Sequence, residues 1–170
     1  RSDALVKKAR GNDKEATATL AIVEKVIDAL RDGKPARSVG SQFEDQALFN
    51  GLQLLTAKPV MYVCNVGEED AATGNTYSEQ VAARAAEEGA VAVVISAAIE
   101  AEIAQLTDQE ERAEFLESIG LEETGLSQIL AAGYQLLGLI TYLTAGPTES
   151  RAWTITAGMK APQAAAVIHT

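Results

Sequence analysis

Two loops of this chain carry polar residues directly after apolar runs. The run "VMYVC" is followed by Asn65, Val66 and Glu68, and the run "AVAVVI" is followed by Ser96 and Ala97. An amide can both donate and accept hydrogen bonds, a carboxylate can accept them from ring N–H groups, and a backbone N–H can donate to a base edge. Together these groups have the chemistry to hold a purine. Taken alone, the patterns also suit ordinary strand-to-helix loops with a serine N-cap.

The spacing of the two runs predicts a β-loop-α-β unit. Residues 60–66 lack polar alternation, which is typical of a strand covered on both faces of a parallel sheet. We expect a helix from Ser78 to about Gly89 and a second strand over residues 90–97, with the right-handed crossover of parallel strands. Ligands of parallel α/β sheets bind beyond the carboxyl ends of the strands, where both polar loops fall. The predicted fold class is therefore α/β.

The chain before this unit is predicted to be helical. Apolar residues spaced alternately by four and three form an a/d seam. They are Ala16, Leu20, Val23, Ile27 and Leu30. Such a seam needs a partner, and we expect residues 4–9 to supply it as the other arm of an antiparallel hairpin whose tip is "RGND" at 10–13. Ser41 and Glu44 have capping-box spacing, which predicts a second helix to about Thr56.

The chain after this unit is predicted to be helical as far as Leu137 and β-rich afterwards. Residues 138–146 and 150–156 have the pattern of a hairpin, and Pro162 suits the first turn of a short helix. Two strands and one helical turn cannot bury a core, so a further domain is expected to begin near Gly138 and to be incomplete. Trp153 is expected to pack within this region, and His169 has no visible catalytic partner.

Composition limits the class of protein. With 47% hydrophobic and 22% charged residues, the chain has the composition of a soluble globular protein. No apolar run approaches the roughly 18 residues of a membrane span, and the first residues lack a signal-peptide core. We therefore expect a cytoplasmic protein without a membrane partner. Cys64 is the single cysteine and is predicted to be a buried, inert thiol.

The charge is unevenly distributed. The net charge of −10 argues against binding nucleic acid through the whole surface, and no specific DNA recognition is expected. Residues 1–40 hold nine basic residues against six acidic ones, whereas residues 68–123 hold fifteen acids against Arg84 and Arg112. A basic arm on an acidic body could contact RNA with one end, and an ordinary solvated face is the alternative.

A longer pattern connects these features. From Lys7 to Thr170 the chain resembles the YchF (Obg-like) family of P-loop ATPases and GTPases, in stretches that include "LQLLTAKPVMYVCNV", "ISAAIEAEIAQL" and "RAWTITAGMKAPQAAAVIHT". The resemblance implies three parts. Residues 1–55 are similar to a helical coiled-coil insertion and its return helix, residues 56–137 to the later half of a P-loop G domain, and residues 138–170 to the beginning of a ubiquitin-like β-grasp TGS domain.

The same resemblance gives the polar loops a role in base recognition. "NVGE" is similar to the N-K-x-D motif of GTPases, with Val66 in place of the lysine and Glu68 in place of the aspartate. A displaced carboxylate loses the selective pairing with guanine, so ATP is expected to bind at least as well as GTP. By resemblance, the residues expected to contact the base are Asn65, Val66, Glu68, Ser96 and Ala97.

The catalytic part of such an enzyme is not found in this sequence. No G-x-x-x-x-G-K-[ST] loop is present to hold phosphates and Mg²⁺, so we assign no catalytic residue and no metal ligand. The resemblance implies that a longer parent protein hydrolyses ATP or GTP with Mg²⁺ and binds the ribosome or ribosomal RNA. This chain alone is expected to be inactive. The alternative is a non-enzymatic module that binds the ribosome or a protein through the helical arm and the TGS region, whereas an independent small α/β enzyme is disfavoured.

Overall fold

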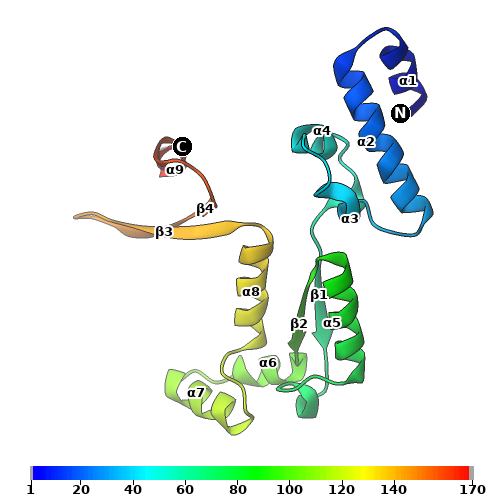
Figure 1. Cartoon of the computed structure of the whole chain (residues 1–170). Coiled ribbons are helices and arrows are strands. Elements are labelled where there is room, and N and C mark those ends of the chain that lie inside the picture. The colour runs from blue at the N-terminus through cyan, green and yellow to red at the C-terminus, as the bar shows by residue number, and fades with distance from the viewer. Residues whose placement is uncertain (1, 169–170) are drawn as a thin grey trace. The chain divides into compact units, whose positions relative to one another are not determined.

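The computed structural model describes residues 2–168. The chain divides into two compact units, Arg1–Pro59 and Val60–Thr170 (Figure 1). Within the described residues, no helix is both long enough and apolar enough to span a membrane. His169, singled out from the sequence, lies outside this range.

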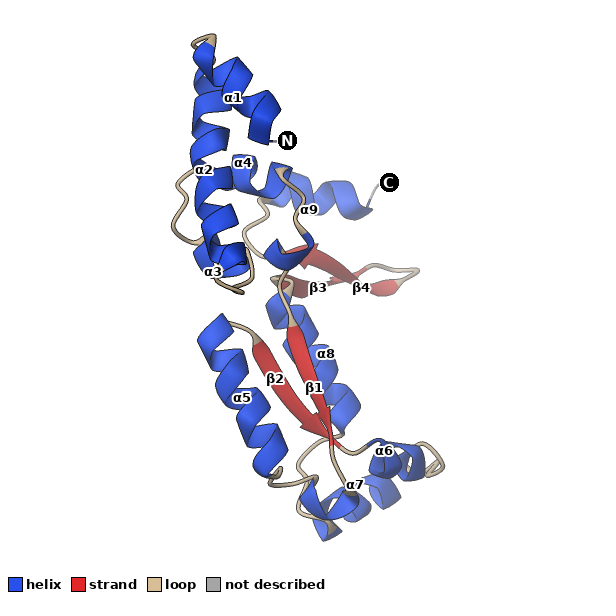
Figure 2. Cartoon of the chain, turned by 90° about the vertical axis from the view of Figure 1, so that its right-hand side faces the viewer, coloured by secondary structure: helices blue, strands red, loops and turns tan. Residues whose placement is uncertain are grey.

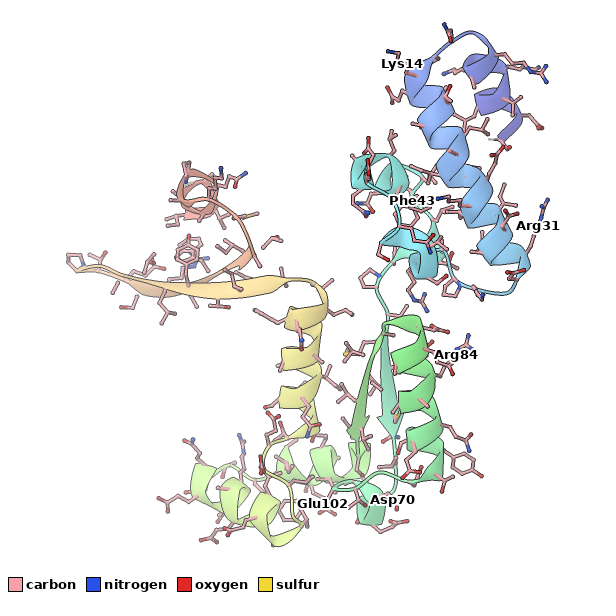
Figure 3. All side chains as sticks on the ribbon, in the orientation of Figure 1. Lys14, Arg31, Phe43, Asp70, Arg84 and Glu102 are labelled. Atoms are coloured by element: carbon pink, nitrogen blue, oxygen red, sulfur yellow. The ribbon has the colours of Figure 1, made fainter. Side chains whose placement is uncertain are left out.

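The first unit begins with a helical hairpin. Helix α1 (Ser2–Arg10) packs against α2 (Lys14–Arg31), and the turn between them contains Asn12 at a φ of 65°. The Asp13 carboxylate caps α2 by accepting the Ala16 N–H at 3.0 Å. Figure 3 shows Lys14 at the start of α2 and Arg31 at its far end. The predicted hairpin with its tip at residues 10–13 is therefore confirmed.

The predicted helix from Ser41 to Thr56 is wrong. The segment follows a short helix, α3 (Arg37–Gly40), and forms α4 (Gln46–Gly51) and the beginning of a 3-10 turn, η1 (Leu55–Ala57). Asp45, rather than Ser41, caps α4 by accepting the Leu48 N–H at 3.1 Å. The helix is interrupted because buried side chains from separate short pieces must converge on α2. The resulting core combines Ile22 and Val26 of α2 with Ala36, Phe43, Phe49 and Leu52.

The second unit contains the predicted β-loop-α-β arrangement. Strands β1 (Met61–Asn65) and β2 (Val91–Ile95) pair in parallel, and α5 (Thr76–Glu88) connects them after the short 3-10 turn η2 (Glu68–Asp70). A capping box made by Asn75 and Ser78 begins α5 earlier than predicted. Gly89 ends the helix at a φ of 65°, a left-handed conformation that suits glycine.

The sheet is covered by one helix on each side. Figure 1 shows α5 and α8 (Gly125–Leu136) on opposite sides of β1 and β2, and both helices contact both strands. The cover is incomplete, since Val63 is 43% exposed. The prediction of a strand buried on both faces is therefore wrong for β1, and Cys64 is a free, half-buried thiol rather than a buried one.

Tyrosine hydroxyls join α5 and α8 to strands, and an ion pair lies within α5. The Arg84 guanidinium donates to Glu88 Oε1 at 2.6 Å, and the Tyr62 hydroxyl donates to Glu88 Oε2 at 3.0 Å (Figure 3 labels Arg84). The hydrogen bond with Glu88 and its negative charge raise the pKa of Arg84. The Tyr134 hydroxyl lies 3.1 Å from the Thr154 hydroxyl, and this hydrogen bond lowers the pKa of Tyr134.

The remaining elements form a helical layer and a hairpin. Helices α6 (Ala97–Ile103) and α7 (Gln109–Ser118) share an apolar cluster centred on Ile99 and Ile103. Strands β3 (Leu139–Ala145) and β4 (Ser150–Thr156) pair antiparallel and are followed by α9 (Ala161–Ile168).

Trp153 packs within the hairpin, as expected. It is half-buried, and its ring N–H donates to the Thr144 hydroxyl at 2.8 Å. The Arg151 guanidinium lies 4.3 Å from the centre of its ring. The Tyr142 hydroxyl donates to the Ala164 carbonyl at 2.9 Å, which joins α9 to β3.

Candidate functional site

The loops after β1 and β2 meet at one edge of the parallel sheet. Figure 2 shows the carboxyl ends of both strands at this edge, where the loops to η2 and α6 begin. The Asn65 side-chain oxygen accepts the Ala97 N–H at 2.9 Å, and the Val66 N–H donates to the Ile95 carbonyl at 2.9 Å. Parallel register carries Asn65 opposite Ile95, so the two loops start level with each other.

This contact fixes the orientation of the Asn65 amide. The backbone N–H of Ala97 can only donate, so the amide atom facing it is the oxygen. The NH₂ group of Asn65 is then left to donate elsewhere, on a residue that is exposed. The Ala97 N–H, which sequence reasoning offered as a donor to a base, is already bonded to Asn65 in this structure.

Glu68 lies in η2, close in sequence to Asn65 but separate from its hydrogen bond. Its side chain is exposed and makes no hydrogen bond or ion pair within residues 2–168. Asp70 has a structural part that sequence reasoning did not assign: its carboxylate accepts the Asn75 side-chain NH₂ at 2.8 Å, and its carbonyl accepts the Gly74 N–H at 2.7 Å. Figure 3 shows Asp70 at the sheet edge where the strands end.

Ser96 differs from the other predicted residues because it is buried. Its residue is 4% exposed, and its hydroxyl has no hydrogen-bond partner in the part of the chain that the structure describes. The hydroxyl does not cap α6 either. A buried hydroxyl without a partner is costly, typically by about 1–3 kcal/mol. The exposed members of the predicted set are Asn65, Glu68 and Ala97, and Val66 is half-buried.

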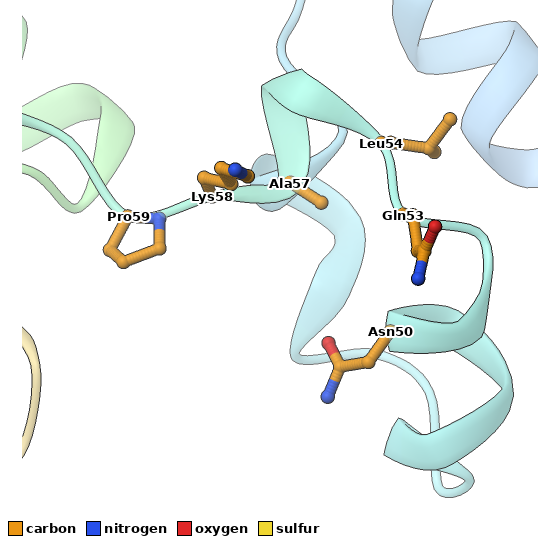
Figure 4. Close-up of a pocket in the computed structure, with 6 residues that line it drawn as sticks. All are labelled: Asn50, Gln53, Leu54, Ala57, Lys58 and Pro59. Atoms are coloured by element: carbon orange, nitrogen blue, oxygen red, sulfur yellow. The ribbon is translucent and has the colours of Figure 1, made fainter.

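A hollow of about 310 Å³ adjoins Asn65 and Val66. It lies between β1 and the beginning of α5, and Tyr77 and Ser78 form part of its wall. The first unit has a separate hollow of about 520 Å³, which contains none of the predicted site residues (Figure 4). Its lining residues are Asn50, Gln53, Leu54, Ala57, Lys58 and Pro59.

Glu100 was not singled out by sequence reasoning. One turn into α6, its carboxylate accepts the Gly125 N–H at 2.6 Å and the Leu126 N–H at 3.3 Å. These are the first two residues of α8, 25 and 26 positions further along the chain. No local sequence pattern indicates a cap supplied over that separation.

The acidic residues near the site are not arranged as a metal centre. Within the described residues, no group of three or more His, Cys, Asp and Glu side chains is placed to hold a metal ion. The described residues therefore do not fit a Mg²⁺ site.

Known proteins match the chain along almost all of its length. "Ribosome-binding ATPase YchF" of Haemophilus influenzae is 49% identical over 166 residues, which cover 98% of this chain and 45% of that protein. The protein of the same name from Bacillus subtilis is 46% identical, covering 96% of this chain and 45% of that protein. The structure of the Schizosaccharomyces pombe YchF GTPase matches with a TM-score of 0.78 at 33% identity, covering 99% of this chain and 48% of that chain.

The chain resembles the YchF family over almost its whole length. A family model described as "YchF-GTPase_C: Protein of unknown function (DUF933)" also matches, over residues 139–170. The predicted resemblance is therefore confirmed, and the mixed α/β fold with its small parallel sheet matches a YchF structure. The chain spans less than half the length of these curated YchF relatives.

Proposed function

We propose that this chain supplies the purine-recognition part of a longer YchF protein that binds and hydrolyses ATP or GTP. The relatives from H. influenzae and B. subtilis are named ribosome-binding ATPases, and the S. pombe relative is named a GTPase. The observation that carries the proposal is the 2.9 Å hydrogen bond from the Ala97 N–H to Asn65. It joins the two loops at the sheet edge where ligands of this architecture bind.

The proposed role of Asn65 follows from this bond. With its oxygen engaged, the amide presents only its NH₂ group, which donates to a ring nitrogen of the base. Adenine and guanine share such an acceptor at N7. Asn65 should therefore contribute to purine affinity without discriminating between ATP and GTP. Ala97 would then support Asn65 rather than contact the base through its N–H.

We attribute the selectivity between adenine and guanine to the residues around Glu68. Guanine presents two donors side by side to an acidic residue, whereas adenine presents an amino donor beside a ring acceptor. Glu68 is exposed and has no partner in residues 2–168 that would fix its carboxylate in the guanine-pairing position. Val66 supplies no charge where the N-K-x-D motif of ordinary GTPases has a lysine. We therefore propose that ATP binds at least as well as GTP.

Phosphate binding and hydrolysis are assigned to the rest of the longer protein. This chain has no phosphate-binding P-loop sequence, and its described residues do not fit a Mg²⁺ site. Residues outside this chain would bind Mg²⁺, and the ion would assist phosphoryl transfer to water. This chain alone should therefore bind the base weakly and hydrolyse nothing.

The other parts of the chain are proposed to serve ribosome binding in the cytoplasm. Residues 1–55 would form the coiled-coil insertion, residues 56–137 the later half of the G domain, and residues 138–170 the start of the TGS domain. The α1–α2 hairpin in the first part supports this proposal, because its tip carries exposed basic residues. They are Lys7, Lys8, Arg10 and Lys14.

The proposed purine site is tested by Asn65→Ala in the full-length protein. The substitution removes both the bond to Ala97 and the donor to the base, so the affinity for ATP and for GTP should fall about tenfold or more. Isothermal titration with each nucleotide measures both affinities. Wild-type affinity in the variant would refute the assignment of Asn65.

A non-enzymatic binding module is the second candidate, and the basic hairpin tip favours it. If docking through phosphates were the whole function, ribosome binding should weaken steeply as salt rises and should not depend on nucleotide. Co-sedimentation with ribosomes at several salt concentrations, with and without ATP, separates the two. An effect of ATP on binding supports the nucleotide-binding protein, and indifference to ATP supports the module.

A further inference from the structure

Helices α6 and α8 are joined by one carboxylate. Figure 1 shows α6 next to the beginning of α8, and the Glu100 side chain bridges them. Its two oxygens accept the Gly125 N–H at 2.6 Å and the Leu126 N–H at 3.3 Å. A negative charge at a helix N-terminus is stabilised by the helix dipole, so the contact combines hydrogen bonding with favourable electrostatics.

The Glu100 carboxylate accepts hydrogen bonds from the first two N–H groups of α8. The first four N–H groups of a helix lack partners within the helix. In α8, Thr124 serves the third and fourth, because its hydroxyl accepts the Ser127 N–H at 3.1 Å and its carbonyl accepts the Gln128 N–H at 3.1 Å. Glu100 serves the first and second. The beginning of α8 is therefore completed from α6.

The contact between Glu100 and α8 lies one helical turn from the loop that carries Ser96 and Ala97. The Glu100 N–H donates to the Ser96 carbonyl at 3.0 Å, so the loop and the carboxylate belong to one helical turn. On the other side, Gly125 packs so closely that a Cβ atom there would lie 2.7 Å from Ile95 Cγ2. Ile95 is the last residue of β2 and immediately precedes Ser96. The start of α6 thus contacts Asn65 through the Ala97 N–H and contacts α8 through the Glu100 carboxylate.

We propose that Glu100 is a positioning residue for the purine loop. By anchoring α6 on α8, it fixes the Ala97 N–H where Asn65 can bond to it, and so fixes the Asn65 amide for the base. The inference rests on the proposed purine site for its functional consequence. The geometric part, that Glu100 holds Ala97 against Asn65, can be measured without any nucleotide.

The test compares Glu100→Ala with Thr124→Ala in the full-length protein. Both substitutions remove caps from the same helix end, but only Glu100 connects that end to α6. Two readouts are needed: the rate of amide hydrogen exchange at Ala97 and the affinity for ATP. Glu100→Ala should speed exchange at Ala97 and weaken ATP binding by about fivefold or more, while Thr124→Ala should change each by less than about twofold.

The outcomes separate this inference from the proposed function. Exchange at Ala97 that is unchanged in Glu100→Ala, or equally faster in Thr124→Ala, would overturn the positioning role. Wild-type protein that does not bind ATP would refute the purine site, and the exchange comparison would still decide the geometric part. Glu100→Gln keeps an acceptor for the Gly125 N–H and should restore part of the ATP affinity, while Thr124→Ala controls for general destabilisation of α8.

Discussion

Asn65→Asp separates the two bonds that Asn65 is proposed to make. Aspartate has nearly the same shape and keeps an oxygen for the Ala97 N–H, which lies 2.9 Å from the asparagine oxygen. It lacks the NH₂ group, so it cannot donate to a purine ring nitrogen. The two loops should stay joined, while the base loses a hydrogen bond.

The magnitude follows from one neutral hydrogen bond. Losing a bond worth about 0.5–1.5 kcal/mol lowers affinity by a factor of roughly 2 to 13, and repulsion between the carboxylate and the ring nitrogen adds to the loss. The loss should be similar for ATP and GTP, because N7 is an acceptor in both. Isothermal titration gives the affinities, and hydrogen exchange at Ala97 reports whether the loops remain joined.

The comparison with Asn65→Ala makes this prediction specific. Asn65→Ala should both weaken nucleotide binding and speed exchange at Ala97, whereas Asn65→Asp should keep exchange as slow as in the wild type or slower, since a charged acceptor makes a stronger bond. Nucleotide affinity in Asn65→Asp that equals the wild-type value would refute the reasoning about the free NH₂ group. Fast exchange at Ala97 in Asn65→Asp would refute the reasoning about the loop contact.

Two stability predictions test the packing of each unit in the full-length protein. Gly125→Ala should lower the free energy of unfolding by about 1–3 kcal/mol, because its Cβ would collide with Ile95. Gly133→Ala in the same helix has open space and should not lower it. Urea denaturation compares the two variants, and equal losses would contradict the close packing at Gly125. Phe49→Ala should lower the free energy of unfolding by about 3–5 kcal/mol, since Phe49 is 4% exposed and its ring centre lies 5.3 Å from that of Phe43. A loss below about 1 kcal/mol in urea denaturation would contradict a core position for Phe49.

Sequence periodicity predicted the sheet and the hairpin but not the details between them. The β-loop-α-β unit was predictable because apolar runs and a helix at that spacing leave few arrangements. The segment after α3 was not, because Ser41 and Glu44 match a capping box locally while burial of Phe43 and Phe49 requires short separate pieces. Tertiary packing overrode local preference there.

The candidate site was predictable only in part. Parallel register places Asn65 beside the loop of Ala97, and this follows from the strands alone. The burial of the Ser96 side chain and the bond that Glu100 makes to α8 depend on how α6 packs, which no short pattern encodes. Long-range caps of this kind require the fold before they can be recognised.

The most direct measurement of the central claim is an intermolecular nuclear Overhauser effect between nucleotide and Asn65 in the full-length protein. With ATP bound, we expect a contact between the side-chain NH₂ protons of Asn65 and the purine H8 proton, which neighbours N7. The same contact should appear with GTP. Bound nucleotide whose H8 proton contacts other residues and not Asn65 would contradict the proposed purine site.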